Sequence, residues 1–211
     1  MIAMLFRFMA RATLIAALLL GWPAIASAET HVSGQQWGVW NVEGSPYIFS
    51  NSVTVPSESL LVVEPGVEVY GWSRSLSVQG RLEASGATFQ AHYGSGGEWD
   101  GIYFNSGSEG VLTNCLITET NGYTQSGYHH AQSAIEIRSS DVTIADCEIS
   151  HVNNGYNNPN GGIHIISCNP TISNVEFIDC SNGLLLEGVW GQTFQEHAFA
   201  ECSSGVAVVA G

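Results

Sequence analysis

Gly162-Ile-His-Ile, Gly183-Leu-Leu-Leu and Gly205-Val-Ala-Val share a pattern in which a small residue precedes alternating apolar and variable positions. Earlier copies read Gly101-Ile-Tyr-Phe and Ala134-Ile-Glu-Ile. The five copies start 33, 28, 21 and 22 residues apart, because the earlier intervals contain inserted segments. Repeats of this length with two-residue alternation predict short strands stacked as a solenoid.

The alternation extends toward the N-terminus and predicts which side chains point inward. The inward series is Val53, Leu76, Ile102, Ile135, Ile163, Leu184 and Val206. It predicts an all-β, single-stranded parallel β-helix of about seven rungs, with three short strands in each rung. A single residue between the second and third strands should adopt left-handed backbone, which Asn and Asp tolerate. These turn residues are Asn114, Asp146, Asn174 and Glu196.

The first 28 residues have the features of a secretory signal peptide. Arg7 and Arg11 precede an apolar run, and Ala26-Ser27-Ala28 supplies a small-residue cleavage site. We therefore expect a secreted or cell-surface protein, with the periplasm as the alternative, and no transmembrane segment. Residues 29–52 are expected to cap the first rung, and the β-helix domain to cover residues 53–211. Because the chain stops just after the apolar residues Val206, Val208 and Val209, we expect the β-helix to be incomplete, continued by further rungs or a C-terminal anchoring domain.

The charge of the chain excludes one class of partner. After residue 28 there are nineteen acidic residues against three arginines and no lysine, a net charge of −16. Such a surface repels nucleic acid and anionic membranes. It is compatible with calcium as a bound ion, or with a solvated surface in a salty habitat.

Five cysteines occupy repeated positions, so register indicates their role. Cys115 and Cys147 share one position of the repeat, Cys180 and Cys202 share another, and Cys168 stands alone. Stacked strands lie ~4.8 Å apart, which holds parallel Cβ atoms slightly too far apart for a relaxed disulfide. We interpret these cysteines as small buried apolar residues, with disulfides within the two pairs as the alternative.

Several stretches resemble the opening of secreted bacterial right-handed parallel β-helix proteins of the pectin-lyase-like class. The resemblance rests on Leu60-Leu-Val-Val-Glu-Pro-Gly-Val-Glu-Val, Leu76-Ser-Val-Gln-Gly-Arg-Leu-Glu-Ala-Ser-Gly and Trp99-Asp-Gly-Ile-Tyr-Phe. It implies a right-handed coil and an extracellular, often glycan-related, role. The catalytic motifs of the polygalacturonase-like group are absent. Lyase-like members of the class use lysine or arginine as the base, and because the chain has no lysine, Arg138 is the candidate along the outward face of the first strands. The class includes lyases, hydrolases, adhesins and passive stalks, so the fold alone does not select an activity.

One outward column is the candidate site. Tyr103, Glu136 and His164 should form a contiguous exposed patch beside Arg138, because neighbouring strands place them in register. A Glu beside a His can act as acid and base, and Arg138 can neutralise a substrate carboxylate. We expect two inserted segments to wall a polysaccharide groove with aromatic and imidazole groups. Their candidate side chains are Tyr123, Tyr128, His129, His130 and Tyr156.

A second, weaker candidate is a metal site on the third strand of each rung. Glu148 and Glu176 should stack outward with Asp179 nearby, and calcium accepts such carboxylate ligands, whereas solvent screening alone would also tolerate them. The expected function is a β-helix module that contacts polysaccharide without catalysis or serves as a structural stalk. The alternative is a polysaccharide lyase or glycoside hydrolase acting on uronate-containing glycans.

Overall fold

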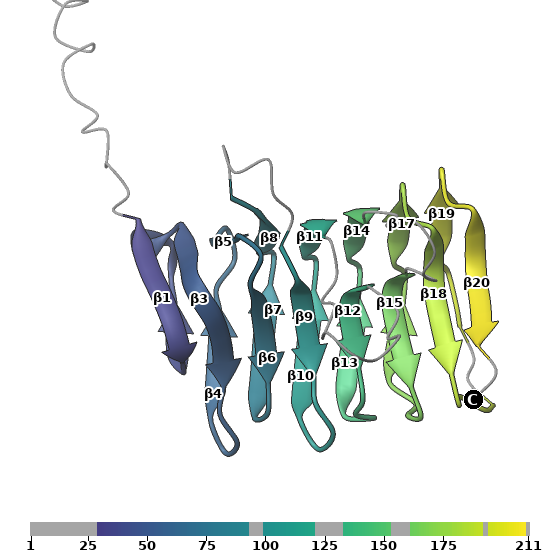
Figure 1. The fold of residues 1–211 in the computed structure, drawn as a ribbon, viewed down its shortest axis with the longest axis horizontal. Coiled ribbons are helices and arrows are strands. Elements are labelled where there is room, and N and C mark those ends of the chain that lie inside the picture. Colours follow the sequence, from purple (N-terminus) through teal and green to yellow (C-terminus); the bar gives the residue numbers. More distant parts are fainter. Residues whose placement is uncertain (1–28, 93–98, 121–132, 153–160, 192–193, 210–211) are drawn as a thin grey trace, which may run out of the picture.

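Parallel strands dominate the structure, a computed structural model that describes residues 29–92, 99–120, 133–152, 161–191 and 194–209. Within those ranges the one helical element is the 3-10 turn η1 (Val42–Gly44). No helix among them is long and apolar enough to cross a bilayer. The strands lie side by side along the long axis, from β1 at the purple end to β20 at the yellow end (Figure 1). The predicted all-β, parallel, solenoid-like architecture is confirmed.

The first row of strands carries the pattern that opened the sequence analysis. Its register joins Val53, Leu76, Ile102, Ile135, Ile163, Leu184 and Val206 as successive partners, as the alternation predicts. The row is β3 (Tyr47–Val55), β6 (Ser75–Val78), β9 (Gly101–Phe104), β12 (Ser133–Ile137), β15 (Gly161–Ile166), β18 (Asn182–Glu187) and β20 (Ser204–Val209).

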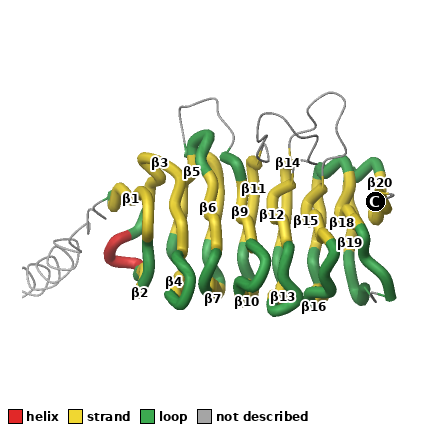
Figure 2. Tube along the Cα trace, turned by 60° about the horizontal axis from the view of Figure 1, so that its bottom comes forward, coloured by secondary structure: helices red, strands yellow, loops and turns green. Residues whose placement is uncertain are grey.

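Two further rows complete the coil, because each chain segment passes through all three rows before returning to the first. The second row lies along the lower side of Figure 2 and comprises β2 (Gly38–Trp40), β4 (Leu60–Val63), β7 (Arg81–Ser85), β10 (Glu109–Thr113), β13 (Val142–Ala145) and β16 (Thr171–Ser173). The third row comprises β5 (Glu68–Gly71), β8 (Thr88–Ala91), β11 (Leu116–Thr120), β14 (Glu148–Val152), β17 (Glu176–Ile178) and β19 (Ala198–Ala200).

The long strand β3 joins the first and third rows into one sheet. Its first half pairs with β5 and its second half pairs with β6. On its other edge lies β1 (Thr30–Gln35), while β2 pairs with β4 in the second row. The segment before residue 53 therefore contributes strands to the first turn of the coil.

At alternate positions along the strands, apolar side chains point inward and fill the interior. Ile102, Ile135 and Ile163 of the first row are fully buried, as are Leu82 and Leu112 of the second. The third row adds fully buried aromatic rings at Phe89 and Phe177. Full burial of one such side chain contributes about 1.5–3 kcal/mol, so the stacked interior is the main source of stability.

Near the start of β15 and of β18, a glycine makes room for an aromatic ring. A Cβ placed on Gly162 would lie 2.5 Å from Phe177 Cδ1, on the buried ring of the third-row strand β17. Gly183 stands in the same relation to Phe199 of β19. The recurring glycine therefore reflects close packing inside one turn of the coil.

The predicted left-handed turn column is confirmed. Asn114, Asp146, Asn174 and Glu196 have φ values of 52°, 55°, 47° and 59°. Asn174 Nδ2 donates to Asp146 Oδ1 at 2.6 Å, which links adjacent turns of the coil. The shared left-handed backbone and the Asn174–Asp146 bond indicate that this column has a structural role.

The cysteines are free thiols. Cys115, Cys147, Cys168 and Cys180 are buried, and Cys202 is half-buried. Cys147 Sγ lies 3.4 Å from the backbone nitrogen of Cys115, so this pair stacks without bonding covalently. Burial raises the pKa of the Cys180 thiol to about 12, which leaves it protonated and unreactive near neutral pH.

Candidate functional site

Tyr103, Glu136 and His164 form a continuous column, as the sequence predicts. The pairing of β9, β12 and β15 places Glu136 opposite both Tyr103 and His164. Their neighbours Ile135 and Ile163 point into the interior, so the column occupies the outer face of the first row. Leu185 of β18 continues it beyond His164.

The expectation of an exposed patch is wrong for two of these three residues. Glu136 is 9% exposed and His164 is 1% exposed, whereas Tyr103 is half-buried. Alternation determines only whether a side chain leaves the interior, and further packing over the sheet determines whether it reaches water. The Tyr103 hydroxyl donates to the backbone oxygen of Asp100 at 2.8 Å.

Arg138 is anchored by Glu136. The Arg138 Nε donates to Glu136 Oε1 at 2.7 Å, and the Arg138 side chain is 37% exposed against 11% for Glu136. This contact leaves both terminal amino groups of Arg138 without a partner among the described residues. Glu136 therefore orients a cationic group whose remaining donors lie at the edge of the column.

The imidazole of His164 is buried near the carboxylates of Glu136 and Glu187. Its Nε2 lies 3.3 Å from Glu187 Oε2, yet neither ring nitrogen makes a hydrogen bond of good geometry within the described residues. Burial lowers the pKa of His164, although the carboxylates of Glu136 and Glu187 act in the opposite direction. The buried ring therefore has little access to a substrate proton.

The expected groove walls lie outside the described residues. These are Tyr123, Tyr128, His129, His130 and Tyr156, which stay predictions. Glu187 of β18 approaches His164, a contact that was not predicted. Its reach follows from the length of a glutamate side chain on the adjacent strand, which sequence spacing alone does not reveal.

The predicted stacking of Glu148 and Glu176 on the third row is present, but these residues are not part of a metal-binding cluster among the described residues. Glu148 and Glu176 are direct partners on β14 and β17, and Ala198 of β19 follows them. Asp179 lies just after β17, with left-handed backbone at φ 51°. Within the described ranges, no group of three or more His, Cys, Asp or Glu side chains is placed to hold a metal ion.

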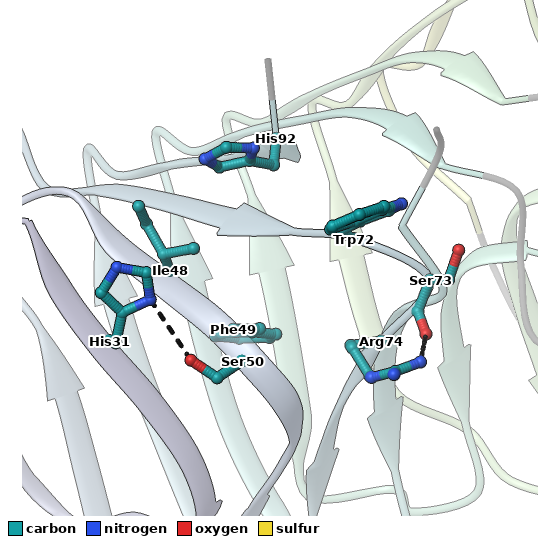
Figure 3. A pocket seen from close by; sticks show the side chains of 8 residues that line it. All are labelled: His31, Ile48, Phe49, Ser50, Trp72, Ser73, Arg74 and His92. Atoms are coloured by element: carbon teal, nitrogen blue, oxygen red, sulfur yellow. Dashed lines mark hydrogen bonds between the residues drawn. The ribbon is translucent and has the colours of Figure 1, made fainter. Parts of the chain in front are cut away.

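An open pocket near the start of the coil was not predicted. It has a volume of about 540 Å³ and lies among β1, β3, the turn between β5 and β6, and the residue after β8. Figure 3 shows Trp72 and Arg74 on one side and His31 on the other, with Phe49 between them. Its lining residues are His31, Ile48, Phe49, Ser50, Trp72, Ser73, Arg74 and His92.

The pocket has a buried apolar floor and a polar rim. Ile48 and Phe49 are buried, whereas Trp72 is 56% exposed. His31 Nδ1 lies 3.2 Å from Ser50 Oγ, a hydrogen bond across the rim. The sequence does show Trp72 and Arg74 close together, in an acidic chain with few arginines. It does not show the opposite wall of the pocket, because His31 comes from a distant segment.

Comparison of the chain with protein-family models, with curated proteins and with solved structures gave no match.

Proposed function

We propose that this protein is a secreted or surface-displayed module, built as a right-handed parallel β-helix of about seven turns, that contacts polysaccharide without catalysis. The leader-like N-terminus and the strongly acidic composition support export. The parallel, solenoid-like stack supports an extended and rigid binding face, because its strands repeat at a spacing of ~4.8 Å.

The observation that carries this proposal is the double role of Glu136. It is the register partner of the half-buried Tyr103, and it orients the guanidinium of Arg138 through its Nε. Sugar hydroxyls accept hydrogen bonds from the remaining guanidinium donors, and the apolar face of a sugar stacks on a tyrosine ring. A preorganised pair loses little conformational entropy on binding.

The same geometry favours binding over the lyase or hydrolase alternative. A lyase must remove a proton, and the Arg138 guanidinium is engaged as a hydrogen-bond donor to Glu136. His164 is too deeply buried to meet the substrate, and Glu136 is engaged in positioning Arg138. These residues therefore support a binding surface in which Glu136 acts as a positioning residue.

The test is incubation of the purified chain with a panel of polysaccharides, with and without calcium. Depletion of protein from solution and new sugar ends are measured in the same tubes. We expect depletion by at least one polysaccharide and no new ends. New unsaturated or reducing ends would overturn the proposal in favour of an enzyme. No depletion by any polysaccharide would overturn it in favour of a stalk.

Two variants localise the binding to the column. Tyr103→Ala and Arg138→Gln should each weaken retention about tenfold, because each removes a direct contact. Arg81→Gln is the matched control, since Arg81 is also ion-paired, to Glu83 and Glu109, but lies on the second row. Equal retention by the Arg138 variant and the control would show that polysaccharide binds elsewhere.

A further inference from the structure

We infer that the pocket lined by Trp72 and Arg74 binds small organic anions, molecules with a flat apolar body and one carboxylate. This site shares no residue with the Tyr103–Arg138 column and takes a different class of ligand. Three features of the pocket carry the inference: an arginine without a carboxylate partner among the described residues, an exposed aromatic rim, and a buried apolar floor.

Arg74 differs from the other arginines that the structure describes. Arg81 and Arg138 are each ion-paired with glutamate, whereas no carboxylate lies within 4.0 Å of Arg74 in the described residues. Its Nη1 donates to the backbone oxygen of its neighbour Ser73 at 2.7 Å. This leaves Nε and Nη2 without partners among those residues, and the planar guanidinium matches the two oxygens of a carboxylate.

The acidic composition of the chain makes the environment of the Arg74 guanidinium unusual. With a net charge of −16 after residue 28, carboxylates are plentiful, yet among the described residues none forms an ion pair with Arg74. Asp100 is near enough for Arg74 to oppose the rise in its pKa that burial causes, but the two do not form an ion pair. An anionic ligand at Arg74 would therefore replace no existing ion pair.

The rest of the pocket favours an apolar ligand body. Ile48 and Phe49 provide a buried floor, and Trp72 exposes 56% of its surface at the rim. A volume of about 540 Å³ is in the range of small-molecule sites, which are mostly apolar with a few polar groups that fix orientation.

The experiment is titration of the purified chain with benzoate, and with benzamide as its neutral isostere, by calorimetry and tryptophan fluorescence. We expect benzoate to bind about tenfold more tightly than benzamide, because only the carboxylate forms a charge-assisted pair with Arg74. Binding of benzoate should weaken as salt is raised from low ionic strength.

Two variants test which residue contacts the carboxylate of the ligand and which contacts its aromatic ring. Arg74→Gln should abolish the preference for benzoate, and Trp72→Ala should weaken binding of both compounds and remove their fluorescence signal. Arg81→Gln and Trp190→Ala are the controls, because Arg81 is ion-paired elsewhere and Trp190 is an exposed tryptophan outside the pocket. Unchanged circular dichroism verifies that each variant is folded.

Three results would overturn the inference. They are equal affinity for benzoate and benzamide, a benzoate preference that survives Arg74→Gln, and no binding of either compound at millimolar concentration. None of them affects the polysaccharide proposal, which rests on Tyr103 and Arg138 and is tested with those variants.

Discussion

The polar column around His164 and the pocket around Trp72 differ in how far their side chains are exposed to solvent. Glu136 and His164 point away from the interior and are nevertheless buried. Trp72 and the floor residue Phe49 belong to one pocket, yet the first is exposed and the second is buried. An outward direction therefore does not expose Glu136 and His164, whereas Trp72 at the rim of the pocket is open to solvent.

This difference shows that a two-residue period determines direction and nothing more. Every strand of the first row sends alternate side chains outward, because successive Cβ atoms point to opposite faces. Whether such a side chain reaches solvent depends on what packs over that part of the sheet. A buried ionisable cluster can therefore form on the outer face of the first row, whereas the exposed rim of the pocket comes from the turn between β5 and β6.

The largest expected effect is on the free energy of unfolding, and it distinguishes a floor residue of the pocket from a rim residue. Phe49→Ala should lower the free energy of unfolding by about 3–5 kcal/mol, because it removes a buried ring that packs edge-on against Trp40 at 6.2 Å. Trp72→Ala should change it by less than about 0.5 kcal/mol, since its ring is mostly in water. Urea unfolding measures both, and similar losses would contradict the division into floor and rim.

A smaller effect tests the packing behind the polar column. Gly162→Ala should cost about 1–3 kcal/mol, because its Cβ would lie 2.5 Å from the buried ring of Phe177. Gly205→Ala is the matched control. Its Cβ would lie 3.1 Å from Phe199, a ring that is 40% exposed and free to shift. If the two substitutions cost the same in thermal or urea unfolding, close packing does not explain the recurring glycine.

The smallest effect is the pH dependence that His164 contributes. Because burial lowers its pKa in the folded protein, the unfolded chain binds this proton at a higher pH than the folded one. Stability should therefore fall as pH decreases below about 6.5, with a slope of at most about 1.4 kcal/mol per pH unit from this residue. Above that pH both states are neutral at this position, and His164 contributes no slope.

His164→Leu tests this contribution, since Leu185 already occupies the next position of the column. Unfolding of both proteins between pH 7.5 and 5.5 should show a shallower decline for the variant. His197, whose pKa burial also lowers, contributes in the same direction, so the difference between the proteins isolates His164. Parallel pH profiles would mean that the buried imidazole is not linked to stability.

Much of the fold can be predicted from local patterns. The register from Val53 to Val206 follows from counting alternate apolar positions, because a strand has only two faces. The turn column from Asn114 to Glu196 follows from the preference of Asn and Asp for left-handed backbone. The adjacency of Tyr103, Glu136 and His164 follows from the same register.

The candidate sites are less predictable, because they depend on contacts between distant segments. The Glu136–Arg138 pair and the approach of Glu187 to His164 depend on how long side chains extend across neighbouring strands. The pocket takes His31, Phe49, Arg74 and His92 from four separate segments, and no single stretch of sequence contains it.

The sequence by itself determined the strands, their order and their register, because these depend on a period of two and on turn residues that act locally. It also determined the net charge and the repeated positions of the cysteines. Only the tertiary structure decided that Glu136 and His164 are buried and that Trp72 and Arg74 border an open pocket. The physical reason is that exposure and ion pairing are properties of all the atoms that surround a side chain, and those atoms come from segments far apart along the chain.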